Sequence, residues 1–329
     1  MKILYIGGTG EISTSCVRES VKLGHDVSVF NRSIRAERLP DGVNVIKGDL
    51  KDDAAYRDIA RQAFDVICQF IIFETDEARR DIEFFSGHTG QYVFISSASA
   101  YYKPLDRFAV VSEETPLRNA YWEYSQKKQA MEELFFAAHG KRHLPVTVVR
   151  PSHTYRKHFP VPVFEGDWTA KRMLDGKPIL VHGDGASLWT LTHADDFAKP
   201  FARLLGNEQA IGEAFHITQS EPYTWLEILN AMGTALGVKP EFATVASDTI
   251  IRYMPDTKGE LLGDKTPSTI FDNSKVKRVA GDFSCDVSLD EGMAGVAKSF
   301  KERVGRVQTN PEWDALCDKI IAEQRSLAT

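Results

Sequence analysis

The chain opens with a short apolar run that ends in a glycine-rich turn. Lys2 to Ile6 leaves no room for a helix before Gly7, and its unbroken apolar character is typical of a buried parallel strand. Apolar residues then recur at helical spacing from Ile12 to Leu23, and Gly24 can cap the end of that helix. The predicted buried stripe of the helix is Ile12, Cys16, Val17 and Val21. The sequence therefore begins with a predicted strand, turn and helix.

The same alternation continues along the chain. Apolar runs predict further strands over 26–30, 43–47, 66–72 and 92–97, then shorter ones over 179–182, 215–218 and 242–245. Helical patterns predict helices over 76–85 and 121–133, and later over 167–174, 194–205, 224–236, 249–253, 287–304 and 311–325. This order predicts an α/β fold with a doubly wound parallel sheet. We expect residues 1–165 to form the sheet domain, joined again by segments near 190–218, and residues 166–329 to form a smaller C-terminal α/β lobe.

The glycine turn carries the first functional prediction. A strand, a glycine turn and a helix place backbone N–H groups and the positive end of a helix against a pyrophosphate. Glycine is needed because a Cβ would block the close approach of phosphate oxygens. We therefore expect the first domain to bind a dinucleotide, the alternative being a strand-to-helix turn without a ligand. The candidate residues of the turn are Gly7, Gly8, Thr9, Gly10, Glu11 and Ile12.

The ends of the second and third predicted strands indicate which dinucleotide binds. A site specific for NAD usually has an acid after the second strand, where it holds the ribose hydroxyls. Here Asn31 is followed by Arg32, which can pair with a 2′-phosphate, so NADP(H) is favoured. An exposed arginine at a strand end is the alternative. Asp49, followed by Leu50, is placed to accept a hydrogen bond from the adenine amino group.

Two further groups of residues could carry chemistry. Ser96, Ser97 and Ser99 cluster at the end of a predicted strand, at the edge where ligands bind in open α/β sheets. Tyr124 and Lys128 stand four residues apart and share a helix face. A nearby ammonium is expected to lower the pKa of the phenol and make Tyr124 a general acid or base near neutral pH. The alternative is a surface helix that happens to carry these two residues.

Composition and charge narrow the classes of function. The 329 residues are 43% hydrophobic and 26% charged, and the net charge of −6 gives no reason to expect a nucleic-acid partner. No apolar run approaches the length of a membrane span and no export signal is visible, so we expect a cytoplasmic protein. The four cysteines form no CxxC pair and the nine histidines no HxxxH or HExxH spacing, so we expect reduced thiols and no metal site.

Several motifs together resemble one known family. GGTGEI from residue 7, Gly-Asp-Leu at 48–50, the serine-rich strand end at 96–99 and Tyr-x-x-x-Lys at 124–128 are similar to the motifs of the extended short-chain dehydrogenase/reductase superfamily, in its NAD-dependent epimerase/dehydratase family. VTVVRPSHTY at 146–155, HADDFA at 193–198 and FDNSK at 271–275 resemble later motifs of that family. The resemblance spans nearly the whole chain and implies a Rossmann-type sheet.

The resemblance also implies roles for single residues. Tyr124 would be the acid/base, and Lys128 would orient the cofactor ribose and support Tyr124. Pro151, within the strand-end motif, is a further candidate cofactor contact. The family also implies a homodimer, in which helices near 76–87 and 119–138 form a four-helix contact.

A serine or threonine of the family polarises the substrate oxygen. Counting back four residues from Tyr102, the match to the family's strand-end tyrosine, lands on Ala98. A flanking serine would have to take the role, and Ser97 is slightly favoured over Ser99.

Departures from the family's pattern narrow the substrate. Sugar-nucleotide dehydratases carry an acidic pair where Ser99 and Ala100 stand, so elimination of water is disfavoured. Where nucleotide-sugar enzymes place an arginine to bind the diphosphate, this chain has Trp189, which could stack on a sugar ring or belong to the core. Ser13 replaces the third glycine of the turn and is small enough for close helix packing. These departures resemble an atypical branch that includes chloroplast stem-loop RNA-binding proteins.

The sequence thus predicts an NAD(P)-dependent oxidoreductase or epimerase that acts on a hydroxyl or carbonyl group of a sugar-like small molecule. NADP is the expected cofactor and NAD the alternative. The second hypothesis is a non-catalytic nucleotide- or RNA-binding protein on the same fold. The candidate substrate residues, each with a core or surface alternative, are Ser99, His153, Tyr155 and Trp189, with His193 and Lys103 beside them.

Overall fold

The computed structural model describes residues 1–33, 39–105, 110–164, 166–307 and 310–326. Its centre is a seven-stranded parallel sheet with the strand order β11-β6-β5-β4-β1-β2-β3. The strands are β1 (Lys2–Ile6), β2 (Asp26–Asn31), β3 (Asn44–Lys47), β4 (Phe64–Gln69), β5 (Thr89–Ile95), β6 (Val146–Pro151) and β11 (Ala214–Ile217). The order reverses at β1 and β4, and ligands bind beside such a reversal, outside the carboxyl ends of the strands.

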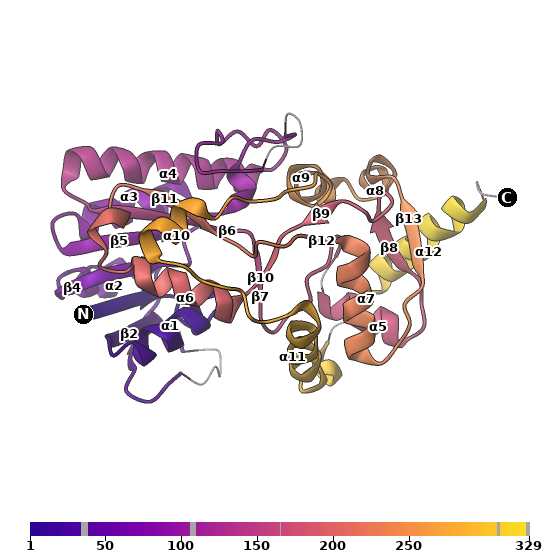
Figure 1. The fold of residues 1–329 in the computed structure, drawn as a ribbon, viewed down its shortest axis with the longest axis horizontal. Helices are drawn as coiled ribbons and strands as arrows, with labels where there is room; N and C mark the ends of the chain where they lie inside the picture. The colour runs from indigo at the N-terminus through magenta and orange to yellow at the C-terminus, as the bar shows by residue number, and fades with distance from the viewer. Residues whose placement is uncertain (34–38, 106–109, 165, 308–309, 327–329) are drawn as a thin grey trace.

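Helices cover both faces of this sheet (Figure 1), because its strands are apolar on both sides. In β1, Leu4 and Ile6 face one core while Ile3 and Tyr5 face the other. The helices on the Leu4 side are α2 (Asp53–Ala60), α3 (Thr75–Phe85) and α4 (Glu123–Arg142). Those on the Tyr5 side are α1 (Ser13–Lys22), α6 (Ala194–Leu204) and α10 (Ser274–Ala280). The doubly wound α/β fold predicted from the sequence is confirmed.

A smaller α/β lobe lies beyond the carboxyl ends of the strands, at the right of Figure 1. Its strands pair two by two: β7 (His153–Tyr155) with β10 (Leu191–His193), β8 (Ile179–His182) with β13 (Phe242–Val245), and β9 (Leu188–Trp189) with β12 (Tyr223–Thr224). Its helices are α5 (Gly166–Leu174), α7 (Trp225–Leu236), α8 (Ser247–Tyr253), α9 (Lys258–Glu260), α11 (Leu289–Lys301) and α12 (Pro311–Ser326). Two separate apolar clusters form its core.

Local sequence signals account for several boundaries. The capping box of Thr224 and Glu227 opens α7, and Gly237, with a φ of 78°, closes it. The predicted helix over 224–236 therefore agrees closely with the structure.

Two predicted strands end earlier than their apolar patterns suggest. The prediction over 66–72 is wrong beyond Gln69, because the side-chain oxygen of Gln69 accepts the N–H of Ile71 and turns the chain toward α3. The prediction over 92–97 is wrong beyond Ile95, because the Ser97 hydroxyl accepts the N–H of Ser99 and starts a short 3-10 turn. Serine residues thus follow β5 at the edge where ligands bind, whereas the apolar residues Phe70 to Phe73 follow β4.

The two lobes are interleaved along the chain. α6 and β11, from the segment near 190–218, pack in the sheet domain. α10 also packs there, through Val276 and Ala280, although residues 274–280 fall in the predicted C-terminal lobe.

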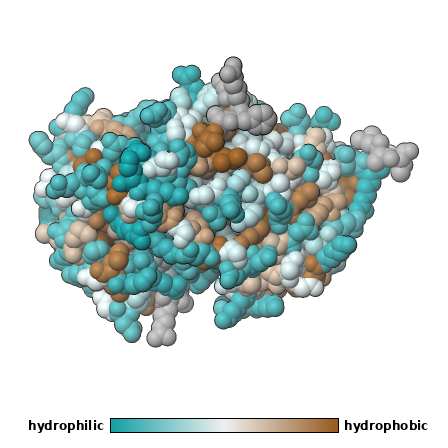
Figure 2. Space-filling model, viewed as in Figure 1, coloured by the Kyte–Doolittle hydropathy of each residue, from teal (hydrophilic) through white to brown (hydrophobic). Residues whose placement is uncertain are grey.

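Figure 2 shows a mostly hydrophilic face with small apolar groups, in keeping with apolar side chains gathered in the cores. Among the described helices, none is both long and apolar enough to cross a membrane. In the same part of the chain, no three His, Cys, Asp or Glu side chains are grouped so that they could hold a metal ion.

Candidate active site

The glycine turn after β1 has room only for glycine at two positions. Gly7 has a φ of +88°, and a Cβ there would lie 2.4 Å from the side chain of Ile71. A Cβ on Gly8 would lie 2.7 Å from the side chain of Val29. The backbone of the turn is thus held flat against the strand ends, which leaves the space above it for a ligand.

Ser13, which stands where the family has its third glycine, ties the turn together. Its hydroxyl accepts the N–H of Gly10 at 2.9 Å and donates to the carbonyl of Gly7 at 2.6 Å. Ser13 is buried against the sheet, so the small side chain also allows α1 to approach closely. A side chain at the start of α1 therefore fixes the conformation of the glycine turn.

Two clefts run outward from the turn and share Gly10, Ile71 and Phe73. The first, of about 370 Å³, is called the Arg32 cleft. Its lining includes all the residues predicted to contact the adenosine half of a dinucleotide, Asn31, Arg32, Asp49 and Leu50, together with Thr9. The second, of about 470 Å³, is called the Tyr124 cleft and includes Glu11, Ile12, Ser97, Lys128 and Pro151.

The Arg32 cleft has a preformed polar rim. The side-chain oxygen of Asn31 accepts the N–H of Ser33 at 2.8 Å, and that of Asp49 accepts the N–H of Lys51 at 3.0 Å. Arg32 lies exposed at its border. The cleft therefore offers polar groups and an arginine beside the ends of β2 and β3.

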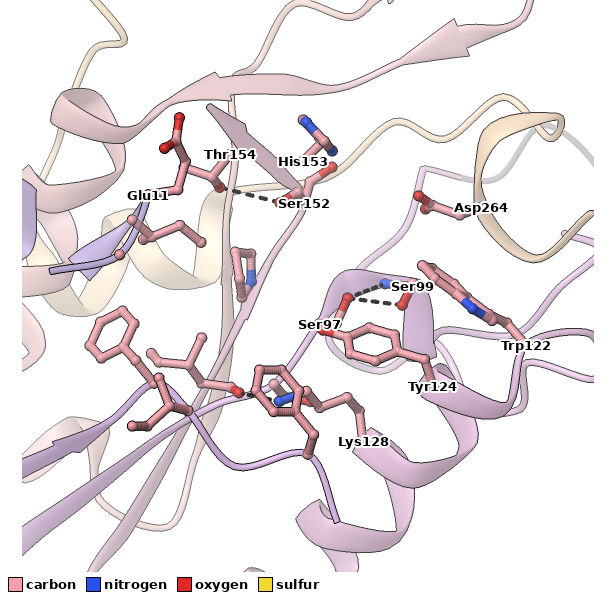
Figure 3. Close-up of a pocket in the computed structure, with 18 of the residues that line it drawn as sticks. Glu11, Ser97, Ser99, Trp122, Tyr124, Lys128, Ser152, His153, Thr154 and Asp264 are labelled. Carbon is pink, nitrogen blue, oxygen red and sulfur yellow. Dashed lines mark hydrogen bonds between the residues drawn. The ribbon is translucent and has the colours of Figure 1, made fainter. Parts of the chain in front are cut away.

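The Tyr124 cleft gathers the predicted catalytic residues (Figure 3). Lys128 is buried, and its ammonium donates to the carbonyl oxygens of Ile72 at 3.1 Å and Ile95 at 3.0 Å. Burial lowers the pKa of Lys128 to about 7, although Glu132 and Glu77 act to raise it. Burial also raises the pKa of Tyr124 to about 12, against the lowering effect of a hydrogen bond with Ser97.

The prediction that Lys128 lowers the pKa of Tyr124 is wrong for the protein without ligands. The ammonium lies 5.7 Å from the centre of the phenol ring and is itself held by backbone carbonyls. Burial is the largest cause of both pKa shifts, and the charge that acts on Tyr124 is that of Asp264, so the phenol holds its proton at neutral pH.

Serine hydroxyls extend from the phenol of Tyr124 into the protein. Ser97 and Ser99 are 2.8 Å apart, Oγ to Oγ, and the buried Ser125 donates to Ser99 at 2.7 Å. Ala98, where the residue count from Tyr102 lands, is buried and does not line the cleft. Ser97 is thus the serine that meets Tyr124, and the Ser96 hydroxyl, also in the lining, is buried without a hydrogen-bond partner among the described residues.

The predicted substrate residues divide into two groups. Ser99 and His153 line the Tyr124 cleft. Trp189 does not, because it is buried with its ring centre 4.2 Å from that of Trp225 and 4.6 Å from that of His153. Tyr155 does not either, because it is buried and its hydroxyl abuts Gly292 of α11.

The two additional candidates also lie outside the cleft lining. His193 caps the start of α6, where its ring nitrogen accepts the N–H of Asp195 at 3.3 Å. Lys103 is buried and donates to the Thr269 hydroxyl at 2.7 Å.

Among the lining residues that sequence reasoning missed, one aromatic and three charged side chains bear on the chemistry of the cleft. Trp122 stacks beside Tyr124, with ring centres 4.9 Å apart. Glu260, Asp264 and Lys265 reach the cleft from the segment after α8, far along the chain. Trp122 stands two residues before Tyr124 and could have been singled out, whereas no motif marks the other three.

The site fits a dinucleotide on structural grounds. The glycine turn leaves no space for side chains under a ligand, and the two connected clefts extend to either side of it. A parallel sheet with this strand order and a tyrosine–lysine pair beside the glycine turn define a short-chain dehydrogenase/reductase of the extended type.

Comparisons with known proteins agree with this class. The model of the NAD dependent epimerase/dehydratase family matches residues 76–218, and that of the NmrA-like family matches residues 1–83. A chloroplast stem-loop binding protein of 41 kDa from Arabidopsis thaliana is 31% identical over 98% of this chain and 85% of its own length. The chain belongs to the NAD-dependent epimerase/dehydratase family.

Another relative and a solved structure are similar to this chain at lower identity. The 2′-dehydrokanamycin reductase of Streptomyces kanamyceticus is 28% identical over 72% of this chain and 67% of its own length. A UDP-glucose 4-epimerase from Bifidobacterium longum, solved with NAD⁺ and UDP, superposes with a TM-score of 0.72 at 19% identity, over 93% of this chain and all of that one. The latter likeness supports the fold.

Proposed function

We propose that this protein is an NAD(P)-dependent oxidoreductase or epimerase that acts on a hydroxyl or carbonyl group of a sugar-like small molecule. The observation that carries the proposal is that Tyr124, Ser97 and Lys128 line one cleft together with the glycine turn. Relatives named as reductases and epimerases support it.

The backbone of Gly8 to Ile12 and the start of α1 would hold the pyrophosphate, and the Arg32 cleft would hold the adenosine half. Lys128 and Pro151 would lie beside the other ribose and the nicotinamide. When bound, the nicotinamide ring supplies hydride transfer. Arg32 favours NADP over NAD because a guanidinium can pair with a 2′-phosphate.

Tyr124 is the residue that moves the proton. Because its pKa is about 12, its Oη holds a proton at neutral pH and can donate it to a substrate carbonyl oxygen. Ser97 donates a second hydrogen bond to the same oxygen, and Ser99 and Ser125 keep the Ser97 hydroxyl oriented. In the oxidative direction Tyr124 Oη takes the hydroxyl proton instead.

The test replaces Tyr124→Phe, with Tyr121→Phe as the matched control, because Tyr121 is more than a third exposed and does not line either cleft. Turnover of NADPH or NADH with a panel of keto-sugars should fall by about 10²- to 10⁴-fold in Tyr124→Phe and stay unchanged in Tyr121→Phe. Cofactor affinity, read from nucleotide fluorescence, should be nearly the same in both. Full activity of Tyr124→Phe would refute the proposal.

A second assay separates the two reaction types. The purified protein is denatured, and the released nucleotide is identified along with its redox state. Tightly held, stoichiometric nucleotide would indicate an epimerase that recycles it in place. A protein that binds added cofactor reversibly would indicate a reductase or dehydrogenase.

We also propose that the protein is a cytoplasmic homodimer. Leu134 and Ala138 of α4, beside Ile82 and Arg79 of α3, line a surface hollow between the two helices predicted to form the contact. A monomeric mass in light scattering at micromolar concentration would refute the dimer.

RNA binding is the second candidate function, because the stem-loop binding relative matches 98% of this chain. The net charge of −6 weighs against it. An RNA-binding protein should lose affinity steeply as salt rises, so absence of salt-sensitive RNA binding at low ionic strength would eliminate this function.

A further inference from the structure

Three charged residues of the smaller lobe face the Tyr124 cleft. Glu260, Asp264 and Lys265 lie in or beside the short π-helical turn Leu261–Lys265. Lys265 Nζ is 3.3 Å from an Asp264 carboxylate oxygen and 3.5 Å from one of Glu260. The Lys265 side chain is only 4% exposed, whereas those of Asp264 and Glu260 are 21% and 45% exposed. The two carboxylates therefore face the cleft, and the lysine lies behind them.

Two buried tryptophans hold Lys265 in that position. Its ammonium lies 4.0 Å from the centre of the Trp189 ring, and its backbone carbonyl accepts the indole N–H of Trp225 at 2.9 Å. The shared cation is buried, so the charged groups of this wall that remain partly exposed are the two carboxylates. Lys265 is thus a positioning residue that aims the carboxylates into the cleft.

The described lining offers no available cation to a phosphate. It contains no arginine, and its other lysine, Lys128, donates to two backbone carbonyls. His153 is neutral, because burial and then the charge of Lys265 hold its pKa well below the ordinary value. A phosphorylated ligand would meet Asp264 and Glu260 without compensation, and like charges repel strongly in a partly dry site.

The rest of the cleft suits a hydroxylated ring. Trp122 and Tyr124 form an aromatic wall on one side, with Asp264 above them in Figure 3. Ser97 and Ser99 add hydroxyl groups to the lining, which can exchange hydrogen bonds with the hydroxyls of such a ring.

We propose that the Tyr124 cleft selects a phosphate-free, hydroxylated ring compound that carries a protonated amine, and that Asp264, assisted by Glu260, binds the ammonium. This inference rests on the proposed function, whose substrate class it names. It also couples binding to chemistry: the Asp264 charge acts to raise the pKa of Tyr124, and an ammonium beside Asp264 offsets that charge. A cationic substrate would then ease proton exchange at Tyr124.

The experiment titrates the protein, with and without saturating NADPH, with kanamycin and with UDP-glucose by calorimetry. Kanamycin is the probe for an amine-bearing hydroxylated ring and UDP-glucose for a diphosphate-bearing one. Kanamycin should bind at least tenfold more tightly than UDP-glucose. Asp264→Asn should weaken kanamycin binding about tenfold, and Glu260→Gln by less, with no change in the affinity for NADPH.

Glu302→Gln is the matched control, because Glu302 is exposed and outside the cleft lining. It should leave both affinities unchanged. The inference is overturned if kanamycin does not bind, if UDP-glucose binds as tightly, or if Asp264→Asn and Glu302→Gln behave alike. Melting temperatures of the variants show whether any loss comes from unfolding.

Failure of this inference is distinguishable from failure of the proposed function. If keto-sugar turnover depends on Tyr124 while kanamycin does not bind, the function stands and the substrate class is wrong. If kanamycin binding depends on Asp264 but no nicotinamide nucleotide binds, the amine site stands and the redox function is wrong.

Discussion

Glu11 and Arg156 hold each other reciprocally across the site. The carboxylate of Glu11 accepts the backbone N–H of Arg156 at 2.7 Å, and the guanidinium Nε of Arg156 donates back to the carbonyl of Glu11 at 3.2 Å. The same carboxylate accepts the N–H groups of Lys157 and His158. The glycine turn is thereby joined to the chain that leaves β7. The side chain of this predicted cofactor residue thus points to protein, and its backbone remains the part that faces the ligand.

Glu11→Ala should loosen the glycine turn. Loss of the carboxylate leaves three backbone N–H groups without their partner, which we expect to lower the free energy of unfolding by about 2 kcal/mol. A less ordered turn should also raise the Kd for NADPH about tenfold. Chemical denaturation and fluorescence titration measure the two effects. Glu11→Gln keeps one acceptor oxygen, so it should lose less stability and less affinity for NADPH than Glu11→Ala. Equal losses in the two variants would contradict this account.

Glu11 also predicts a dependence of stability on pH. Burial acts to raise its pKa, but hydrogen bonds from His158 and Lys157 outweigh burial and lower it from 4.5 to about 2. A carboxyl whose pKa is lowered by folding stabilises the protein above pH 4.5, and this contribution is lost as the pH falls toward 2. The stability difference between wild type and Glu11→Gln should therefore shrink between pH 5 and 2.

Ser13→Ala should show whether Ser13 affects cofactor binding by ordering the glycine turn or only through the overall stability of the protein. The variant loses both hydrogen bonds of the hydroxyl to the turn, which we expect to cost about 1–2 kcal/mol and to weaken NADPH binding. Ser20→Ala is the matched control, because Ser20 is buried in the same helix and bonds to Tyr5 at 2.7 Å, away from the turn. It should lose similar stability and retain the affinity for NADPH. Equal losses of affinity would mean that Ser13 acts only through general stability.

The sequence predicted the sheet and the glycine turn well, because both depend on local patterns. Apolar runs between helices indicate buried parallel strands, and glycines with no room for a Cβ indicate a turn against a ligand. The residue count landed on Ala98, and Ser97 was only slightly favoured over Ser99 as the flanking serine; the hydrogen bond between Tyr124 and Ser97 supports that choice.

The substrate side could not be predicted in the same way. Trp189 and Tyr155 follow family motifs, but each packs against residues from later segments, Trp225 and Gly292. Asp264 reaches Tyr124 from 140 positions along the chain, and only tertiary packing brings the two together. The predicted direction of the Tyr124 pKa shift was wrong for a related reason, since the spacing of two residues on a helix says nothing about their burial.

Lys128→Met should reveal a buried titrating lysine. Folding lowers the pKa of Lys128 from 10.5 to about 7, so between these values the unfolded chain binds more protons than the folded protein. The stability of the wild type relative to Lys128→Met should therefore rise with pH from 7 to 9.5, by at most about 1.4 kcal/mol per pH unit. Lys127→Met, at the neighbouring half-buried position, should show no such slope, because hydrogen bonds to Glu74 and Glu123 raise the pKa of Lys127. Denaturation curves at several pH values measure it, and parallel curves for the two variants would contradict the burial of Lys128.

Arg32→Ala should change the choice of cofactor. If Arg32 pairs with the 2′-phosphate, the variant loses a charge-assisted contact and its Kd for NADPH should rise about 10- to 100-fold. The Kd for NADH should change little, because NADH has no 2′-phosphate. The difference should narrow at high salt, since Arg32 is exposed and its attraction is screened.

Lys51 provides the internal comparison for that prediction, because it is a second cation in the lining of the Arg32 cleft. Lys51→Ala should leave the preference for NADPH intact if the guanidinium is the phosphate ligand, since a planar fork suits phosphate better than a mobile ammonium. If Lys51→Ala loses the preference and Arg32→Ala keeps it, the phosphate lies on the β3 side of the cleft. If neither substitution changes the affinity for NADPH relative to that for NADH, the protein uses NAD. In that case Asn31, rather than an acid, holds the ribose hydroxyls.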